Sequence, residues 1–168
     1  MTRSVEPMLQ EFREEAGITR RVLEKVPGDK LGWKPHPKSM SLGQLALHVA
    51  TIPGALSRLT QLDSLDVTQA NFQPPSPGSL KEVMDGYEQS VRDAEAWLSS
   101  ITDEQASASW RLMKKDQQIS ARPRVSVMRS IMLNHWYHHR GQLSVYLRLL
   151  DVPLPVIYGR SADENPFA

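Results

Sequence analysis

Residues 128–150 read MRSIMLNHWYHHRGQLSVYLRLL and hold three of the five histidines of the chain inside one helical pattern. His135 and His139 are four residues apart, and residues at this spacing lie on one face of an α-helix, one turn apart. Two imidazoles placed in this way can bind one metal ion. The stretch therefore predicts a long helix that carries two metal ligands on the same face.

Two further helical patterns lie in the first third of the chain. In residues 5–26, apolar residues recur every three or four positions, as on a helix that buries one stripe. A second helix follows Ser41, which has with Gln44 the spacing of a capping box. Its apolar stripe includes His48, so we expect this imidazole to point inward. Pro53 lacks a backbone donor and predicts a kink or a break in the helix beside His48.

The middle and the end of the chain alternate between loop and helix. Residues 65–78 are rich in proline and predict a loop, after which Ser79 and Glu82 predict a second capping box and a third helix. Residues 109–124 are charged and poorly periodic, which predicts an irregular or hairpin-like connection. The tail at 153–168 has no periodicity and should pack as an extended strap.

Four amphipathic helices, the last from about residue 124 to 150, predict an all-α fold. The expected architecture is a four-helix bundle with a longer irregular connection before the last helix, and side chains on facing helices build the sites of such bundles. The 168 residues have the size of one domain, so we expect residues 1–168 to form a single domain.

The composition excludes several classes of protein. The 20 basic residues nearly balance the 19 acidic ones, and no basic cluster indicates a nucleic-acid surface. No apolar stretch is long enough for a membrane helix, and the first residues lack the apolar segment of a secretion signal, so a cytoplasmic protein without membrane partners is expected. Cysteine is absent, which leaves histidine and carboxylate side chains as the good metal ligands.

His48, His135 and His139 together predict one metal site across the bundle. Three neutral imidazoles leave a coordination position open for water or substrate, as in catalytic zinc sites. The alternative is that each histidine is a separate core or surface residue with satisfied hydrogen bonds. Three inward imidazoles without a ligand would leave several buried polar groups to satisfy, which favours the metal site. The expected nucleophile is a metal-bound water or thiol, and the sequence identifies no catalytic side chain.

Residues 135–139 have the outer spacing of the H-E-x-x-H motif of metallopeptidases, but Trp136 stands where the general-base glutamate belongs. This substitution excludes a peptidase of that type. His138 is the alternative metal ligand. The other interpretation of His138 is a residue on the flank or surface of the helix that binds no metal. Arg140 and Gln142 are candidates to contact a substrate or a ligand histidine, although an arginine on a helix more often extends its charge to solvent. By exclusion, the candidate acidic partners of the site are Glu88, Asp93 and Glu95.

Three segments resemble the DinB-like, or DinB/YfiT-like, family, namely WKPHPKSMSLGQLALHVA at 33–50, HWYHHRGQLSVYLR at 135–148 and DVPLPVIYGRSADE at 151–164. The resemblance covers nearly the whole chain. It implies an up-down-down-up four-helix bundle, commonly dimeric, with a divalent metal held by three histidines. At the matching positions these are His48, His135 and His139, the residues that the spacing selects. Imidazole ligands suit Zn, Ni, Cu and Fe, and we expect Zn or Ni.

The resemblance also implies a range of functions, because family members with known activities include thiol-dependent transferases and a mycothiol-dependent isomerase. The leading hypothesis is a metal-dependent enzyme, either a thiol-dependent transferase or a hydrolase. Its expected partners are a small-molecule thiol, an electrophilic substrate and a second copy of the chain. The competing hypothesis is a non-enzymatic metal-binding or structural dimeric stress-response protein.

Overall fold

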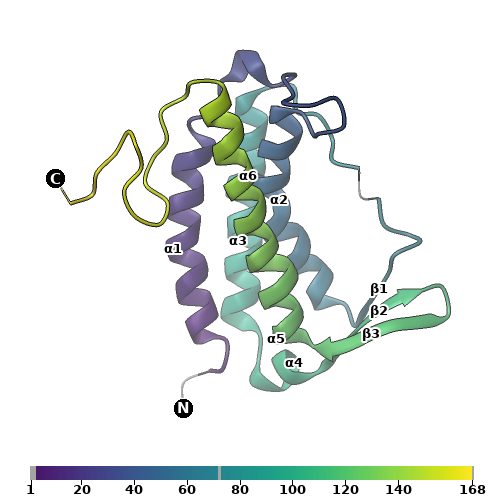
Figure 1. Cartoon of the computed structure of the whole chain (residues 1–168). Helices are drawn as coiled ribbons and strands as arrows, with labels where there is room; N and C mark the ends of the chain where they lie inside the picture. The colour runs from purple at the N-terminus through teal and green to yellow at the C-terminus, as the bar shows by residue number, and fades with distance from the viewer. Residues whose placement is uncertain (1–2, 72, 168) are drawn as a thin grey trace.

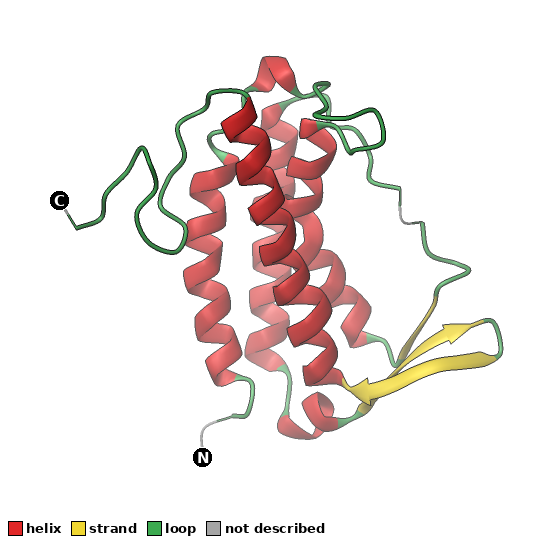
Figure 2. Ribbon diagram, viewed as in Figure 1, coloured by secondary structure: helices red, strands yellow, loops and turns green. Residues whose placement is uncertain are grey.

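A computed structural model of the protein describes residues 3–71 and 73–167. The chain is mostly helical, with a small sheet at one end of the helices (Figure 2). The described residues form four long helices that lie side by side in Figure 1, namely α1 (Glu6–Leu23), α2 (Leu42–Gln61), α3 (Leu80–Ser100) and α6 (His135–Leu149). Within the described ranges, no helix is both long enough and apolar enough to cross a membrane.

Shorter elements connect the long helices. The helical ones are the 3-10 turn η1 (Gly28–Lys30), α4 (Asp103–Ser107), α5 (Arg124–Val127) and the π-helical segment η2 (Met128–Asn134). The strands are β1 (Ser64–Asp66), β2 (Ser109–Lys114) and β3 (Gln117–Pro123). They form one sheet in the order β1-β2-β3, in which β2 runs parallel to β1 and antiparallel to β3.

The sheet corrects the expectation of an all-α chain. Residues 109–124 do form the anticipated hairpin, but β1 lies at the start of the stretch that predicted only a loop. β1 has three residues, too few to show alternation, and it is a strand only because it pairs with β2, with Leu65 opposite Leu112. The prediction failed because the partner strand lies more than forty residues further along the chain.

The helix starts follow the predicted capping in one case and depart from it in the other. Ser41 Oγ accepts from the Gln44 amide at 3.2 Å, and Gln44 Oε1 accepts from the Ser41 amide at 2.9 Å, which completes a capping box. Ser79 Oγ likewise accepts from the Glu82 amide at 3.2 Å. The Glu82 carboxylate, however, accepts from the Gly78 amide instead, so the second capping box is only half formed.

The predicted alternatives at Pro53 were a kink or a break, and the break does not occur, because helix α2 continues through Pro53. Proline has no backbone N–H, and the carbonyl of Val49 therefore lacks its usual donor within the helix. The buried indole of Trp136 supplies the missing donor, with Nε1 at 2.8 Å from Val49 O. The carbonyl that proline leaves free is thus the point at which the last helix is joined to α2.

The last helical stretch is not one regular α-helix as expected. Elements α5, η2 and α6 follow one another without a gap, and the seven residues of η2 have π-helical hydrogen bonding. A π turn contains more residues than an α turn and is frequent at functional sites. Amphipathic periodicity alone cannot distinguish such a segment, which here directly precedes His135.

Arg140 attaches α6 to α1 on the other side. Its side chain is 1% exposed, with Nη1 at 2.6 Å from Glu15 Oε2 and a hydrogen bond to Thr19 Oγ1 at 3.0 Å. The expectation that this charge extends to solvent is wrong, because the carboxylate on α1 compensates it inside the protein. The tail that follows α6 runs beside α1 (Figure 1). Tyr158 of this tail accepts a further hydrogen bond from Arg140 at 2.5 Å.

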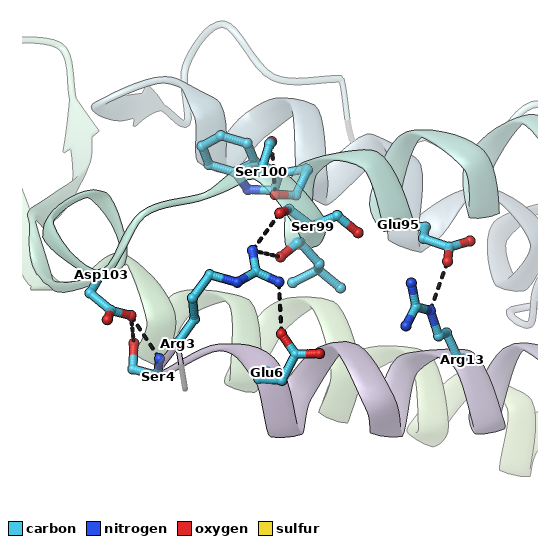
Figure 3. A network of polar contacts seen from close by, with 10 residues as sticks. Arg3, Ser4, Glu6, Arg13, Glu95, Ser99, Ser100 and Asp103 are labelled. Atoms are coloured by element: carbon cyan, nitrogen blue, oxygen red, sulfur yellow. Dashed lines mark hydrogen bonds and ion pairs between the residues drawn. The ribbon is translucent and has the colours of Figure 1, made fainter. Parts of the chain in front are cut away.

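Polar contacts join the start of α1 to the end of α3 and to α4 (Figure 3). The Arg3 guanidinium donates to the Ser99 carbonyl and pairs with Glu6 at 2.7 Å. Ser4 donates to the Asp103 carboxylate at 2.7 Å through both its amide and its hydroxyl. These contacts hold the end of the helices that lies nearest the sheet.

Substitutions of Trp136 and Pro53, made singly and together, test whether the indole replaces the donor that proline lacks. Trp136→Phe should lower the free energy of unfolding by roughly 2–4 kcal/mol, because the Val49 carbonyl loses its donor and the smaller ring leaves a gap. Pro53→Ala restores a helical donor for this carbonyl, so the loss in that background should be smaller by about 1 kcal/mol. Urea denaturation of the four proteins measures the difference, and equal losses in both backgrounds would contradict the account.

Candidate metal centre

His48 from α2 meets His135 and His139 from α6, and all three side chains are half-buried. One nitrogen from each imidazole lies within 4.8 Å of the other two. The Nε2 atoms of His48 and His135 are 3.2 Å apart, and the ring of His139 is centred 4.5 Å from that of His48. The structure thus brings together the three residues that the sequence selected as ligands.

The spacing of the nitrogens fits a shared divalent ion. With metal–nitrogen bonds of about 2.0–2.1 Å, two ligand nitrogens of a tetrahedral site lie about 3.3 Å apart. The separation of 3.2 Å between His48 and His135 agrees with this value. Three imidazoles are also a ligand set that Zn and neighbouring divalent metals accept.

The environment keeps the imidazoles neutral, as metal ligands must be. Burial, together with the smaller effects of the nearby His139 and His135, lowers the pKa of His48 from its ordinary value of 6.5 to about 4. Burial is also the main cause that lowers the pKa of His135 and of His139. At neutral pH all three therefore carry a nitrogen lone pair that is free to coordinate.

Gln142 contacts two histidines: the candidate ligand His139, which it orients, and the neighbouring His138. Its Oε1 lies 2.7 Å from His139 Nδ1, so in this orientation the amide oxygen accepts a hydrogen bond from Nδ1–H and leaves Nε2 of His139 free for an ion. Its Nε2 lies 3.0 Å from His138 Nε2. His138 is exposed and belongs to this surface pair, outside the group of three.

The acidic residues proposed by exclusion lie elsewhere. Each one on α3 pairs with an arginine at the protein surface, and the pairs are Glu88 with Arg20, Asp93 with Arg58 and Glu95 with Arg13. Among the described residues, the group able to hold a metal consists of histidines alone. The candidate centre is therefore built without a carboxylate ligand.

A cavity of about 450 Å³ opens beside the candidate centre, and His48 and His135 form part of its wall. The rest of the wall comes from α2, the sheet and the segment α5–η2, and most of it is apolar. Sequence reasoning missed this cavity because one side of it is the sheet. The only signal in the sequence is a short alternation in β2, where Trp110 and Leu112 lie on one face and Arg111 on the other.

Comparisons with known proteins agree with the motifs. The sequence profile of the DinB family matches residues 1–165. The uncharacterized protein YrdA of Bacillus subtilis (strain 168) is 25% identical over 170 residues, which cover 98% of this chain and 93% of that protein. A solved DinB-like protein from Bacillus cereus ATCC 10987 has a TM-score of 0.71 at 25% identity, covering 94% of this chain and all of the other. A second one, from Bacillus subtilis, has a TM-score of 0.70 at 20% identity, covering 93% and 100%.

The lowered pKa of His48 predicts a pH dependence of stability in the metal-free protein. Between about pH 6.5 and pH 4 the unfolded chain binds a proton at His48 that the folded protein does not bind, so the free energy of unfolding should fall as the pH falls through this range. His48→Gln should reduce the slope. Urea denaturation at a series of pH values, with a chelator present, measures the free energy of unfolding of both proteins. Identical slopes of this free energy against pH would show that His48 is not buried as described.

Proposed function

Because the chain belongs to the DinB family, we propose that it is a metal-dependent enzyme whose divalent ion is held by His48, His135 and His139. The observation that carries this proposal is the convergence of three neutral imidazoles beside an apolar cavity. When bound, such an ion lowers the pKa of a coordinated water or thiol and so supplies a nucleophile at neutral pH.

The residues of the chain then have separable roles. His48 and His135 form part of the cavity wall, so a substrate held in the cavity lies next to the site. Gln142 holds His139 in the orientation that ligation needs. Because the chain has no cysteine, a thiol nucleophile must come from a small molecule, which makes a thiol-dependent transferase or a hydrolase the two reaction types that fit.

The proposal includes the finer expectations that come with the family. We take α1, α2, α3 and α6 to be the four helices of an up-down-down-up bundle. In support, they lie side by side in Figure 1, where the chain runs in one direction along α1 and α6 and in the other along α2 and α3. The proposed ion is Zn or Ni, two of the metals that imidazole ligands suit. The protein acts as a homodimer in the cytoplasm, and sedimentation of the purified chain tests the dimer.

Metal content tests the ligands directly. Each of His48→Ala, His135→Ala and His139→Ala should reduce the metal bound by untagged purified protein at least about tenfold, because two imidazoles hold an ion much more weakly than three. Elemental analysis of the native-expressed protein gives both the identity and the amount of metal. His138→Ala is the matched control, since this exposed neighbour lies outside the group and should keep the full amount.

A full metal complement in His48→Ala would refute the three-histidine site, and a loss in His138→Ala equal to that of the other variants would make His138 a ligand. Gln142→Ala should weaken binding by about 10- to 100-fold without removing a ligand. A turnover screen of the metal-loaded protein with low-molecular-weight thiols and electrophiles, and with ester and amide substrates, then separates transferase from hydrolase. Metal binding without turnover in every assay would support the alternative, a non-enzymatic metal-binding dimer.

A further inference from the structure

The cavity beside the histidines has two walls of different origin. One wall is helical, and includes Ile52, Leu56 and Leu59 of α2 and Ile131 of η2. The other wall is one face of the sheet. Alternate residues of each strand point to the same side, and register pairs Leu112 of β2 with Leu65 of β1 and with Ser120 of β3, so all three strands contribute to it.

The sheet also places a positive charge on this wall. Arg122 lies opposite Trp110 in the register of β2 and β3, and both line the cavity. Trp110 is 4% exposed, whereas Arg122 is exposed, so Arg122 lies where the cavity wall meets solvent. Arg122 takes part in no ion pair with residues 3–71 and 73–167, which are the ones that the structure describes. The described lining of the cavity contains no acidic side chain.

We propose that this cavity binds a small amphipathic anion, with its apolar body between α2 and the sheet and its anionic group paired with Arg122. The volume of about 450 Å³ and the mostly apolar wall with few polar groups are typical of sites for small organic ligands. An unpaired guanidinium at the opening selects a carboxylate or a similar anion, to which it can donate two hydrogen bonds.

Because the cavity lies beside the candidate metal centre, this anion would be the electrophilic substrate of the proposed enzyme or one portion of that substrate. The apolar body would lie beside His48 and His135, which line the same cavity. This assignment as a substrate rests on the proposed metal-dependent function. The binding of the anion itself depends only on the cavity and Arg122, so the two can fail separately.

Octanoate and 1-octanol are probes that share an apolar chain and differ in charge. Isothermal titration calorimetry of the full-length protein, as purified and after chelation, should show binding of both, with octanoate bound about tenfold more tightly or better. Ala55→Phe should weaken both probes at least about tenfold, because Ala55 lies in the wall and is exposed to the cavity. Ala96→Phe, at an exposed position of α3 outside the cavity, is the matched control and should bind as wild type.

Arg122→Gln should remove the preference for octanoate and leave the affinity for 1-octanol unchanged. Arg111→Gln is its control, because Arg111 is exposed on the same sheet but is not part of the cavity lining. Octanoate binding that is lost on chelation and kept in Arg122→Gln would place the anion on the ion and overturn the role of Arg122. No binding of either probe, or equal binding in Ala55→Phe, would overturn the proposal as a whole.

Metal content distinguishes these failures from failure of the proposed function. Ala55→Phe and Arg122→Gln leave all three ligand histidines in place, so each variant should keep the metal content of wild type. Loss of probe binding with the metal retained supports the anion site alone. A protein that binds octanoate through Arg122 but holds no metal would confirm the cavity and refute the metal-dependent enzyme.

Discussion

The hydrogen bond from the Trp136 indole to the Val49 carbonyl is the interaction on which the arrangement of α2 and α6 depends. It exists because Pro53 cannot donate to that carbonyl within α2. A buried carbonyl without a donor would cost about 1–3 kcal/mol, so the indole must approach at this one point. Trp136 directly follows His135, and Val49 directly follows His48. The bond that satisfies the proline-containing helix therefore also brings the imidazoles of His48 and His135 close together, with ring centres 5.3 Å apart.

Helix α6 is held from both sides, which keeps the histidine face directed at α2. Trp136 attaches it to α2, while the buried Arg140 attaches it to Glu15 on α1 at 2.6 Å. Both anchors carry a penalty if their partner is removed, because an unpaired buried donor or charge is more costly than the pair is favourable. Sites on such rigid elements hold their ligands more accurately than sites on loops. This explains how half-buried imidazoles remain close together and neutral.

The helices and the sheet contribute different parts of the proposed site. The helices supply the three imidazoles and the amide that orients His139, and these features suit a nucleophile held at one fixed position. The sheet supplies an apolar wall with Arg122 at its edge, and these features suit recognition of a particular small molecule. Ligation and selectivity thus lie on separate elements, so variation in the hairpin can change the bound molecule while the metal ligands stay the same.

The sequence by itself determined the long helices, the start of α2 at its capping box and the pair of His135 and His139 on one helix face, because each depends on spacing within a few residues of helix. It also selected His48 as an inward residue, but only the packing of α2 against α6 brings His48 to that pair. The tertiary structure alone decided the rest. β1 is a strand only through pairing with a distant segment, and Arg140 is buried only because Glu15 on another helix compensates its charge. The seven residues of η2 are too few for their apolar pattern to distinguish a π turn from an α turn. The cavity belongs to this second group, since its wall combines alternate residues of three strands with two helical segments, and no local pattern records which distant side chains will face one another.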